Sequence, residues 1–340
     1  MESTEISNLV LTGIKPTGRI HLGNYLGAIR PALELASKHR AYFFIADYHA
    51  LTTIQDRARF NRRIEKLAAT WLALGLDPER VVFYRQSAIP EIFELMWVLG
   101  CISPKGWLNR AHAYKGAVEA NLAAGRDADA QVNAGLYNYP VLMAADILAF
   151  QTDLVPVGRD QRQHVEMARE MAEAFNRAYG PVLKRPQALV NEAVHTVSGQ
   201  DGRKMSKSYG NEIPVLAQPD ELRRLVMRIV TDSRPPEAPK DPEQCNLYAL
   251  YRHFADHTDA LRLRKHYREG GVAYQTVKQA LAETLIDHFK PARERFAALM
   301  ADGDQIEKIL DNGAARAREV ARTTLMAVRQ AVGIDRMRPL

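Results

Sequence analysis

The sequence predicts an α/β domain with a parallel sheet, followed by an all-helical domain. Before residue 218, short apolar, β-branched or aromatic runs alternate with longer helical patterns, and these runs end in small or polar residues. The alternation is typical of a parallel sheet with crossover helices, which binds its ligands at the carboxyl ends of the strands. After residue 218 the pattern is helical throughout. A length of 340 residues also favours two domains over a single hydrophobic core.

The order of these patterns predicts the elements of the α/β domain. Strands are expected where aromatic and β-branched residues cluster, at residues 9–13, 41–47, 81–86 and 153–158. Helices are expected at about residues 24–38, 57–74, 90–101 and 139–150.

The rest of the chain is expected to contain helices only. Pro219 and Asp220 are typical of a helix start, and the proline- and charge-rich segment 233–244 is typical of an exposed connection. A basic, alanine-rich helix is expected at roughly 304–331. The predicted division is an α/β domain over 1–217, a helical domain over 218–300, and a C-terminal segment over 301–340 that packs back on the α/β domain.

Composition and charge exclude several classes of protein. With 46% hydrophobic and 25% charged residues the chain is neither disordered nor fibrous. A net charge of +6 permits an anionic partner such as nucleic acid without requiring one. Cys101 and Cys245 form no CxxC, so we expect neither a disulfide framework nor a protein metal site. Without a secretory pattern or a membrane-length apolar run, a cytoplasmic protein without membrane association is expected.

The stretch GRKMSKSYGN, residues 202–211, places Lys204 and Lys207 between two glycines. Most short charged runs are solvated surface loops, and the stretch alone leaves that interpretation open. The alternative is a mobile clamp for a ligand with several negative charges. Lysine suits such a clamp because it is a compact charge on a flexible stem, and Gly202 and Gly210 suit hinges.

A second candidate phosphate site follows the first expected strand, in GIKPTGRIHLGN. Its glycines allow a tight turn and close approach to a ligand. A helix is expected to begin near Gly23 and Asn24, and its free amides and positive dipole end suit a phosphate. His21 is placed to donate to the same group, although an isolated HxGN is more often a structural loop. The spacing is not GxGxxG, so no dinucleotide site is predicted.

Taken together, HLGN and KMSKS resemble the paired signatures of the class I aminoacyl-tRNA synthetases. KMSKS is intact, whereas Asn24 stands where many members have a second His, a variant of the tryptophan and tyrosine branch. The similarity covers nearly the whole chain and is specifically to bacterial-type tryptophanyl-tRNA synthetases. Further matching segments are YPVLMAADIL (139–148), TDLVPVGRDQRQH (152–164) and VTDS (230–233).

The resemblance implies a Rossmann-like catalytic domain and an ATP-dependent ligation of L-tryptophan to tRNA(Trp) in two steps. The amino-acid carboxylate attacks the α-phosphate of ATP, pyrophosphate leaves, and the terminal ribose hydroxyl of the tRNA then attacks the adenylate. Lys204 and Lys207 are implied to stabilise the charge that develops on the β- and γ-phosphates. One such preorganised contact typically contributes about 3–4 kcal/mol. Mg²⁺ on the triphosphate follows from this chemistry rather than from a carboxylate cluster.

Catalytic and ATP-binding roles are implied for residues from several parts of the chain. The implied catalytic residues are His21, Asn24, Lys204, Lys207 and Lys115. The implied ATP-binding residues are Lys15, Pro16, Thr17, Gly23, Asn24, Gly158, Arg159, Asp160, Val197, Lys204, Met205, Ser206, Lys207 and Ser208. Without the resemblance, Lys115 is an ordinary surface lysine and Asp160 a helix N-cap.

Two of these residues depart from the family pattern. Lys15 stands where many tryptophan enzymes carry Gln, and Arg159 replaces an acidic residue. Because Lys15 adds positive charge beside the substrate carboxylate and ATP, we expect it to change affinity rather than to abolish activity.

Asp146 is notable before any resemblance is invoked, because nearly all its neighbours in YPVLMAADILAF are apolar. A carboxylate there either points to solvent or is paired or hydrogen-bonded. The resemblance implies that it accepts a hydrogen bond from the indole N–H, with Met143 packing on the ring. His49 is implied to line the same pocket, and Gln161 to hold the amino-acid end.

Tyrosine is the close rival substrate, since Asp146 can also accept from a phenol O–H. Tyrosine enzymes of the family commonly place a second tyrosine hydroxyl on the first strand, where this chain has Leu11. A pocket without that partner favours an indole over a phenol.

The implied partners besides L-tryptophan and ATP are tRNA(Trp) and a second copy of the chain. Arg223, Arg224, Arg262 and Arg264 fit a phosphate-contacting face, although solvated helix faces look the same. The apolar stretch at about 90–120 is the expected homodimer interface. The other function classes are a retired tRNA-binding paralogue, which would not need the lysine clamp, and a small nucleotidyltransferase, which would lack the helical domain.

Overall fold

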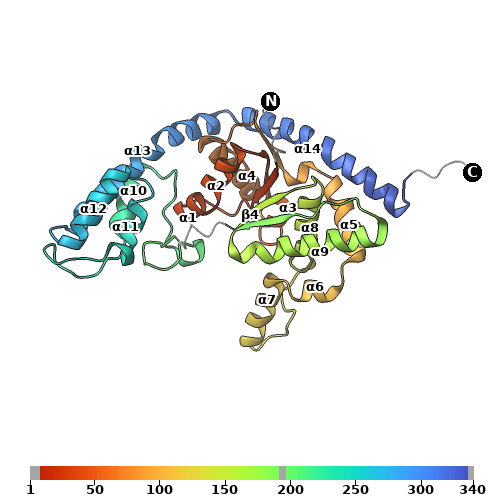
Figure 1. Ribbon diagram of the computed structural model, residues 1–340, viewed down its shortest axis with the longest axis horizontal. Coiled ribbons are helices and arrows are strands. Elements are labelled where there is room, and N and C mark those ends of the chain that lie inside the picture. Colours follow the sequence, from red (N-terminus) through yellow and green to blue (C-terminus); the bar gives the residue numbers. More distant parts are fainter. Residues whose placement is uncertain (1–7, 191–196, 336–340) are drawn as a thin grey trace, which may run out of the picture.

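A computed structural model describes residues 8–190 and 197–335. At its centre lies a five-stranded parallel sheet of order β3-β2-β1-β4-β5 (Figure 1). The strand order reverses between β1 and β4, and open parallel sheets bind ligands outside the carboxyl ends of such a pair. The predicted fold class is confirmed. The strands are β1 (Leu9–Ile14), β2 (Arg40–Ile45), β3 (Val81–Arg85), β4 (Leu154–Val157) and β5 (Gln187–Val190).

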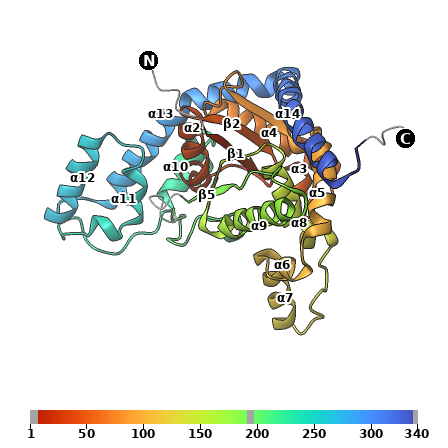
Figure 2. The same ribbon diagram turned by 45° about the vertical axis from the view of Figure 1, so that its right-hand side comes forward.

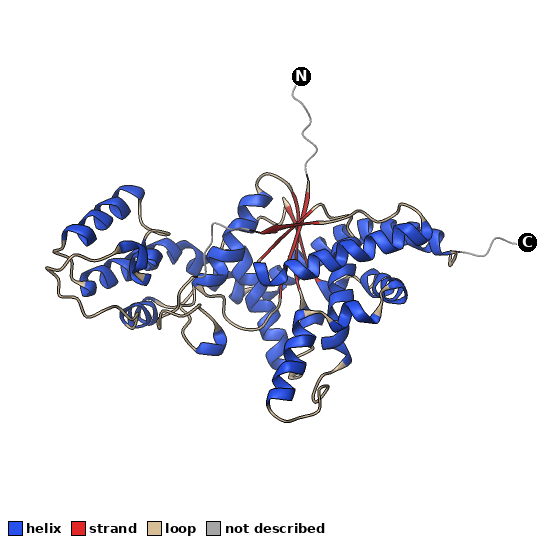
Figure 3. Cartoon of the chain, turned by 60° about the horizontal axis from the view of Figure 1, so that its bottom comes forward, coloured by secondary structure: helices blue, strands red, loops and turns tan. Residues whose placement is uncertain are grey.

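Helices cover both faces of this sheet (Figure 3). In the α/β part they are α1 (Leu22–Asn24), α2 (Arg30–Ala36), α3 (Asp47–Ala50), α4 (Arg57–Ala73), α5 (Glu91–Ile102), α6 (Lys105–Asn109), α7 (His112–Ala123), α8 (Ala134–Leu148) and α9 (Arg162–Tyr179). Single turns of other helix types lie at Tyr25–Ile29, Gln86–Ala88, Arg159–Gln161, Lys207–Tyr209 and Pro242–Gln244.

Most predicted elements lie within a few residues of their observed bounds, but β5, α3, α6 and α7 lie outside the predictions, and α9 was expected only as a helix start after Asp160. Helix α8 begins at Ala134 rather than near residue 139. Its start is set by Asn133, whose side chain accepts a hydrogen bond from the Leu136 N–H at 2.8 Å. Pro140 lies inside the helix. In a sequence, a proline predicts a helix boundary, because it lacks the backbone N–H that a helix interior needs.

The sheet separates two hydrophobic cores. Along β2, Phe43 and Ile45 pack into the core formed with α4 and α13, whereas Tyr42 and Phe44 pack into the core formed with α5, α8 and α9. This alternation follows from the pleat, which points successive side chains to opposite faces. Because both faces are covered, the strand reads as a continuous apolar run.

The C-terminal third contains helices and connecting loops, with no strand among its described residues. Helix α13 packs against both α10 and α4 and so joins the α10–α12 lobe to the sheet domain (Figure 2). The segment 233–244 is largely exposed, as predicted, but Lys240 is buried and its ammonium donates to three backbone carbonyls at 2.9–3.1 Å. The helices are α10 (Pro219–Met227), α11 (Asn246–Tyr251), α12 (His257–Glu269), α13 (Tyr274–Ala301) and α14 (Gly303–Val332).

Helix α14 returns to the α/β domain and packs along β3 and α5. Gly313 makes the approach possible, because a Cβ atom there would lie 1.8 Å from the Phe83 carbonyl oxygen. Glu91 on α5 pairs with Arg318 at 2.8 Å and with Arg322 at 3.0 Å. Within residues 8–190 and 197–335, no helix combines the length and apolar character needed to span a membrane.

Candidate active site

A cavity of about 490 Å³ opens at the carboxyl ends of β1 and β4, where the strand order reverses. This volume is typical of small-molecule sites. The cavity brings together residues that are far apart in the sequence and that the sequence analysis singles out. These are Leu11, Lys15, His49, Met143, Asp146, Gly158 and Gln161.

Asp146 projects into this cavity from α8 and is 1% exposed. The His49 Nε2–H donates to its Oδ2 at 3.0 Å, and the Gln86 Nε2 donates to both carboxylate oxygens at 2.8 Å. Burial raises the pKa of Asp146, and the hydrogen bonds from His49 and Gln86 oppose this rise. Solvent exposure of this carboxylate is therefore excluded. Its Oδ1 retains acceptor capacity for one further donor from a ligand.

A second chain of contacts shapes the wall of the cavity. The Tyr139 hydroxyl meets the His164 ring, and His164 Nδ1 lies 3.0 Å from Gln161 Oε1. Lys15 places its ammonium 5.5 Å from the centre of the Tyr139 ring, a cation–π contact. Burial lowers the pKa of Lys15. The wall thus contains both the Gln161 amide and the Lys15 ammonium. Together these two groups suit the carboxylate of an amino acid.

The floor of the cavity is apolar at β1, where Leu11 is 2% exposed and lines it. The nearby Tyr84 hydroxyl is buried and has no hydrogen-bond partner within the described parts of the chain. Burial, and then the Asp146 charge, raise the pKa of Tyr84, so this phenol stays neutral.

The turn after β1 leads into a helix N-terminus that His21 caps. Its Nδ1 accepts from the Asn24 N–H at 3.3 Å, and the Asn24 Oδ1 accepts from the His21 N–H at 3.3 Å. Since Nδ1 accepts, a neutral ring carries its proton on Nε2. Burial, and then the charge of Lys207, lower the pKa of His21 to about 4. His21 is therefore a neutral donor at physiological pH, and a π-helical turn at Tyr25–Ile29 follows it.

The lysine loop lies directly over this turn. The Lys207 ammonium donates to the Thr17 Oγ1 at 3.4 Å, and a Cβ atom at Gly18 would lie 3.4 Å from the same nitrogen. Gly18 also has a φ of +146°, which favours glycine. Between the two lysines Met205 is buried in the core, and its N–H donates to the Val197 carbonyl at 2.8 Å. Two stretches that are distant in the sequence thus form one cationic site.

Asn211 holds the lysine loop in shape, and it was not among the predicted site residues. Its Oδ1 accepts from the Ser206 N–H at 2.8 Å, and its Nδ2 donates to the Asp201 Oδ1 at 2.6 Å and the Lys204 carbonyl at 3.1 Å. Gly202 and Gly210, which flank the lysines, both have positive φ, at 80° and 62°.

The structure leaves some predicted residues apart from this cluster. Lys115 is exposed on α7, pairs with Glu119 at 3.7 Å, and is absent from the residues that line the cavity. Lys204 is exposed, with its backbone bridged to Ser198. Pro16 lies in the turn between Lys15 and Thr17, Ser208 contacts Ser206 at 2.8 Å, and Arg159 is exposed in a single helical turn. The side chain of Asp160 lies outside the described part of the chain.

Gln86 is the other site residue that the sequence analysis missed. A signal for it exists: with Arg85 it is one of the polar residues that follow the apolar run of β3 at the carboxyl edge of the sheet. Asn211 carries no comparable signal, because an asparagine in a polar loop is ordinary.

Comparisons with known proteins agree with this arrangement. The family model described as tRNA synthetases class I (W and Y) matches residues 4–290. The chain is 52% identical over 335 residues to a tryptophan–tRNA ligase of Pseudomonas aeruginosa, covering 97% of this chain and 74% of that protein. It is 46% identical to a tryptophan–tRNA ligase of Neisseria meningitidis, covering 97% and 98% of the two chains.

Among solved structures, the fold resembles that of tryptophanyl-tRNA synthetase from Campylobacter jejuni, crystallised with ADP and tryptophan. The TM-score is 0.87 at 42% identity, with 96% of this chain and 99% of the other covered. A tyrosyl-tRNA synthetase from Aeropyrum pernix shares the fold alone, with a TM-score of 0.66 at 20% identity.

Proposed function

Since this chain belongs to the class I tRNA synthetase family of tryptophan and tyrosine enzymes, we infer that it is a tryptophan–tRNA ligase. It activates L-tryptophan with ATP and transfers it to tRNA(Trp), with release of AMP and pyrophosphate. The tyrosine and retired-paralogue alternatives are not favoured, because proteins that share 46–52% identity with this chain over 97% of its length are tryptophan–tRNA ligases.

One observation of the structure carries the choice of amino acid. The buried carboxylate of Asp146 faces a cavity whose floor is apolar at Leu11, so it offers a single polar acceptor at the end of an apolar slot. An indole has one N–H donor and no acceptor, which matches this slot. A phenol would leave its own acceptor without a partner, at a cost in affinity.

The first chemical step follows from the cationic site. A carboxylate oxygen of tryptophan attacks the α-phosphorus of ATP, the bond from this phosphorus to the bridging oxygen breaks, and pyrophosphate leaves with the bonding electrons. Lys207 beside Thr17 stabilises the charge that develops on the leaving group, together with the His21 Nε2–H. Lys15 and Gln161 orient the attacking carboxylate at the wall of the cavity.

ATP enters as its magnesium complex in this proposal. The described residues contain no group of three or more His, Cys, Asp or Glu side chains arranged to hold a metal ion. In this proposal the cation belongs to the substrate and takes phosphate oxygens and water as ligands, as Mg²⁺ commonly does on nucleotides.

The remaining parts of the chain serve the tRNA and the assembly. We assign anticodon recognition to the α10–α13 region and the homodimer interface to α5 and its neighbours, in a cytoplasmic enzyme. Arg223, Arg262 and Arg264 pair in the free chain with Glu283, Asp259 and Glu243 at 2.7–3.4 Å. To contact a phosphate of the tRNA, each of these arginines must therefore exchange its carboxylate partner for the phosphate.

ATP–pyrophosphate exchange with each standard amino acid in turn tests the proposed function. Exchange that depends on tryptophan alone is the expected result. Exchange with tyrosine would mean that Leu11 does not set the preference. Loss of exchange with every amino acid, in folded protein that binds ATP, would favour the retired paralogue.

A further inference from the structure

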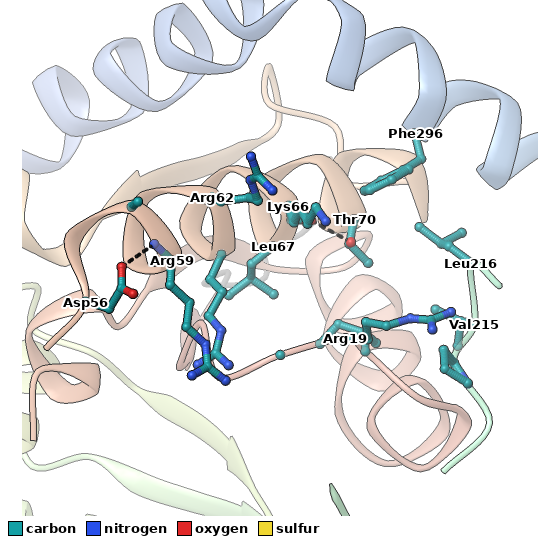
Figure 4. A pocket seen from close by; sticks show the side chains of 15 residues that line it. Arg19, Asp56, Arg59, Arg62, Lys66, Leu67, Thr70, Val215, Leu216 and Phe296 are labelled. Carbon is teal, nitrogen blue, oxygen red and sulfur yellow. Dashed lines mark hydrogen bonds between the residues drawn. The ribbon is translucent and has the colours of Figure 1, made fainter. Parts of the chain in front are cut away.

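Two cavities adjoin the turn that Lys207 contacts, and among the described residues neither shares a lining residue with the cavity around Asp146. The smaller has a volume of about 290 Å³ and is lined by Thr17, Arg59, Arg63, Asp56 and residues 53–55. The larger, about 650 Å³, shares Asp56, Arg59 and Arg63 with it and extends to Phe296 (Figure 4). Since the two cavities share three lining residues, they form one basic depression next to the phosphate turn.

Most of the positive charge of this depression comes from α4, which contributes Arg59, Arg62, Arg63 and Lys66, and Arg19 is a further cation in the lining. Arg59 and Arg63 lie one helical turn apart, and neither forms an ion pair with any residue in the described parts of the chain. By contrast, α9 pairs Arg162 with Glu166 at 2.8 Å at the same spacing. Like charges four residues apart destabilise a helix by about 0.2–0.5 kcal/mol. The arrangement on α4 therefore works against the fold, which points to a role in binding an anion.

Asp56 is the acidic residue in this lining. Its Oδ1 accepts from the Arg59 N–H at 2.9 Å, so it serves as the N-cap of α4. The positive end of the α4 dipole lies at the same place. In Figure 4, Arg59 runs from α4 toward the segment that leads to Arg19, whereas Arg62 leaves the opposite side of the helix.

Thr17 connects the depression to the catalytic cations. Its hydroxyl accepts from the Lys207 ammonium at 3.4 Å, and it lines the smaller cavity with Arg59 and Arg63. Arg63 also acts on Lys207: after burial, its positive charge contributes to lowering the pKa of that ammonium. An anion that moves past Lys207 and Thr17 thus meets the two arginines next.

We propose that Arg59 and Arg63 form a second phosphate subsite that binds inorganic pyrophosphate as it separates from the adenylate. The inference rests on the proposed function, which makes pyrophosphate the product released next to Lys207. The subsite gives the leaving anion a binding position outside the tryptophan pocket, and in the reverse reaction it is where pyrophosphate first binds.

Pyrophosphate fits this place better than an RNA backbone. The smaller cavity is bounded by Thr17 and by residues 53–56, so it suits a compact anion rather than a continuous strand. Its two cations, Arg59 and Arg63, lie next to Thr17 and the turn to which the proposed function assigns the triphosphate, whereas Arg19, Arg62 and Lys66 line the larger cavity alone.

The test compares the full-length wild type with the Arg59→Gln/Arg63→Gln double variant and with Arg62→Gln as the matched control. Arg62 has the same charge on the same helix and lines the larger cavity but not the smaller one, so it tests whether the pair beside Thr17 is required. Calorimetry with pyrophosphate alone gives Kd, and tryptophan-dependent exchange gives KM for pyrophosphate. We expect both to rise about tenfold in the double variant and to change less than twofold in Arg62→Gln, since two partly exposed charged contacts are lost. An Arg63→Lys variant should retain most of the affinity.

Three outcomes are decisive. A tenfold loss of pyrophosphate affinity that occurs only in the double variant supports the subsite. The difference in affinity between wild type and double variant should become smaller when salt is added. Equal Kd values for pyrophosphate in all folded variants overturn it. A rise in KM for tRNA alone overturns it in favour of an RNA contact. Calorimetry does not depend on amino-acid activation, so failure of tryptophan-dependent exchange in the wild type would refute the proposed function without deciding the subsite.

Discussion

A few buried polar side chains, each held by neighbours from other elements, set the chemistry at the scale of single residues. Asp146 is held by His49 and Gln86, and His21 is held by Asn24. Burial acts in opposite directions on these groups, because it raises the pKa of the Asp146 carboxyl and lowers that of the His21 ring. The same low polarity thus keeps His21 neutral and makes hydrogen bonds to Asp146 strong.

We expect Asp146→Asn to weaken tryptophan binding. The amide would present an N–H₂ group where Gln86 Nε2 and His49 Nε2 already donate, and one acceptor would be lost. KM for tryptophan in the exchange reaction should rise by about tenfold or more, with KM for ATP changed less than twofold. Asp47→Asn is the control, because Asp47 is also buried but bonds Ser87 and does not line the cavity. Equal rises in KM for tryptophan and in KM for ATP would contradict the assignment of Asp146 to tryptophan binding.

We expect His21 to make stability depend on pH in the acidic range. Its pKa is about 4 in the folded chain and about 6.5 when unfolded. Between these values the unfolded state binds the extra proton, so the free energy of unfolding falls as the pH drops from about 6.5 toward 4. His21→Asn keeps an acceptor for the Asn24 N–H but cannot titrate. From pH 7 to 5 the wild type should lose on the order of 2 kcal/mol more than the variant in urea unfolding; parallel curves would refute this.

At the scale of elements, close approach of backbones determines how α14 joins the sheet. Its Gly313 lies against the Phe83 carbonyl of β3, and salt bridges from Glu91 to Arg318 and Arg322 hold α5 beside it. The helix therefore covers an edge of the sheet that lies more than 200 residues earlier in the sequence.

We expect Gly313→Ala to destabilise the protein. The new Cβ would overlap the Phe83 carbonyl oxygen, so α14 must shift from β3, at a cost of about 2–3 kcal/mol. The matched control is Gly116→Ala on α7, where no atom lies within 4 Å of the added carbon. That change should stabilise the helix by about 0.5–1 kcal/mol. Urea unfolding of both variants measures the difference, and similar midpoints would show that α14 is not tightly packed.

At the scale of the whole molecule, apolar surface remains uncovered on α5 in the single chain. Trp97 is 75% exposed and Phe93 is 40% exposed. Exposed aromatic residues of this kind mark interfaces, and this surface lies within the stretch that the sequence predicts for the homodimer contact.

We expect Trp97→Glu to shift a dimer toward monomers. A carboxylate buried at an apolar contact without a partner costs several kcal/mol, so sedimentation velocity at micromolar concentration should show a smaller species than for the wild type. Met326→Glu is the control, since Met326 is 67% exposed on α14 and lies outside α5. A monomeric wild type, or an unchanged dimer in the Trp97 variant, would count against this interface.

Much of this architecture could be predicted because its signals are local. Strands β1 to β4 are short apolar runs, and both signature stretches are continuous in the chain. Strand β5 was missed because QALV has only partly buried or exposed residues and gives a weak pattern. The N-cap at Asn133 extended α8 beyond the boundary that Pro140 suggests.

The α/β class, the places of β1 to β4 and the family could be predicted from the sequence, because hydrophobic periodicity and contiguous motifs are properties of neighbouring residues. The hold of Gln86 on Asp146, the shaping of the lysine loop by Asn211, and the position of Arg59 and Arg63 beside Thr17 became visible in the folded chain alone. Each of these contacts joins residues whose spacing in the chain carries no signal. Asn211 acts within its own loop, whereas Gln86 meets Asp146 because parallel strands bring their carboxyl ends to one edge of the sheet, where the loops and helices that follow converge.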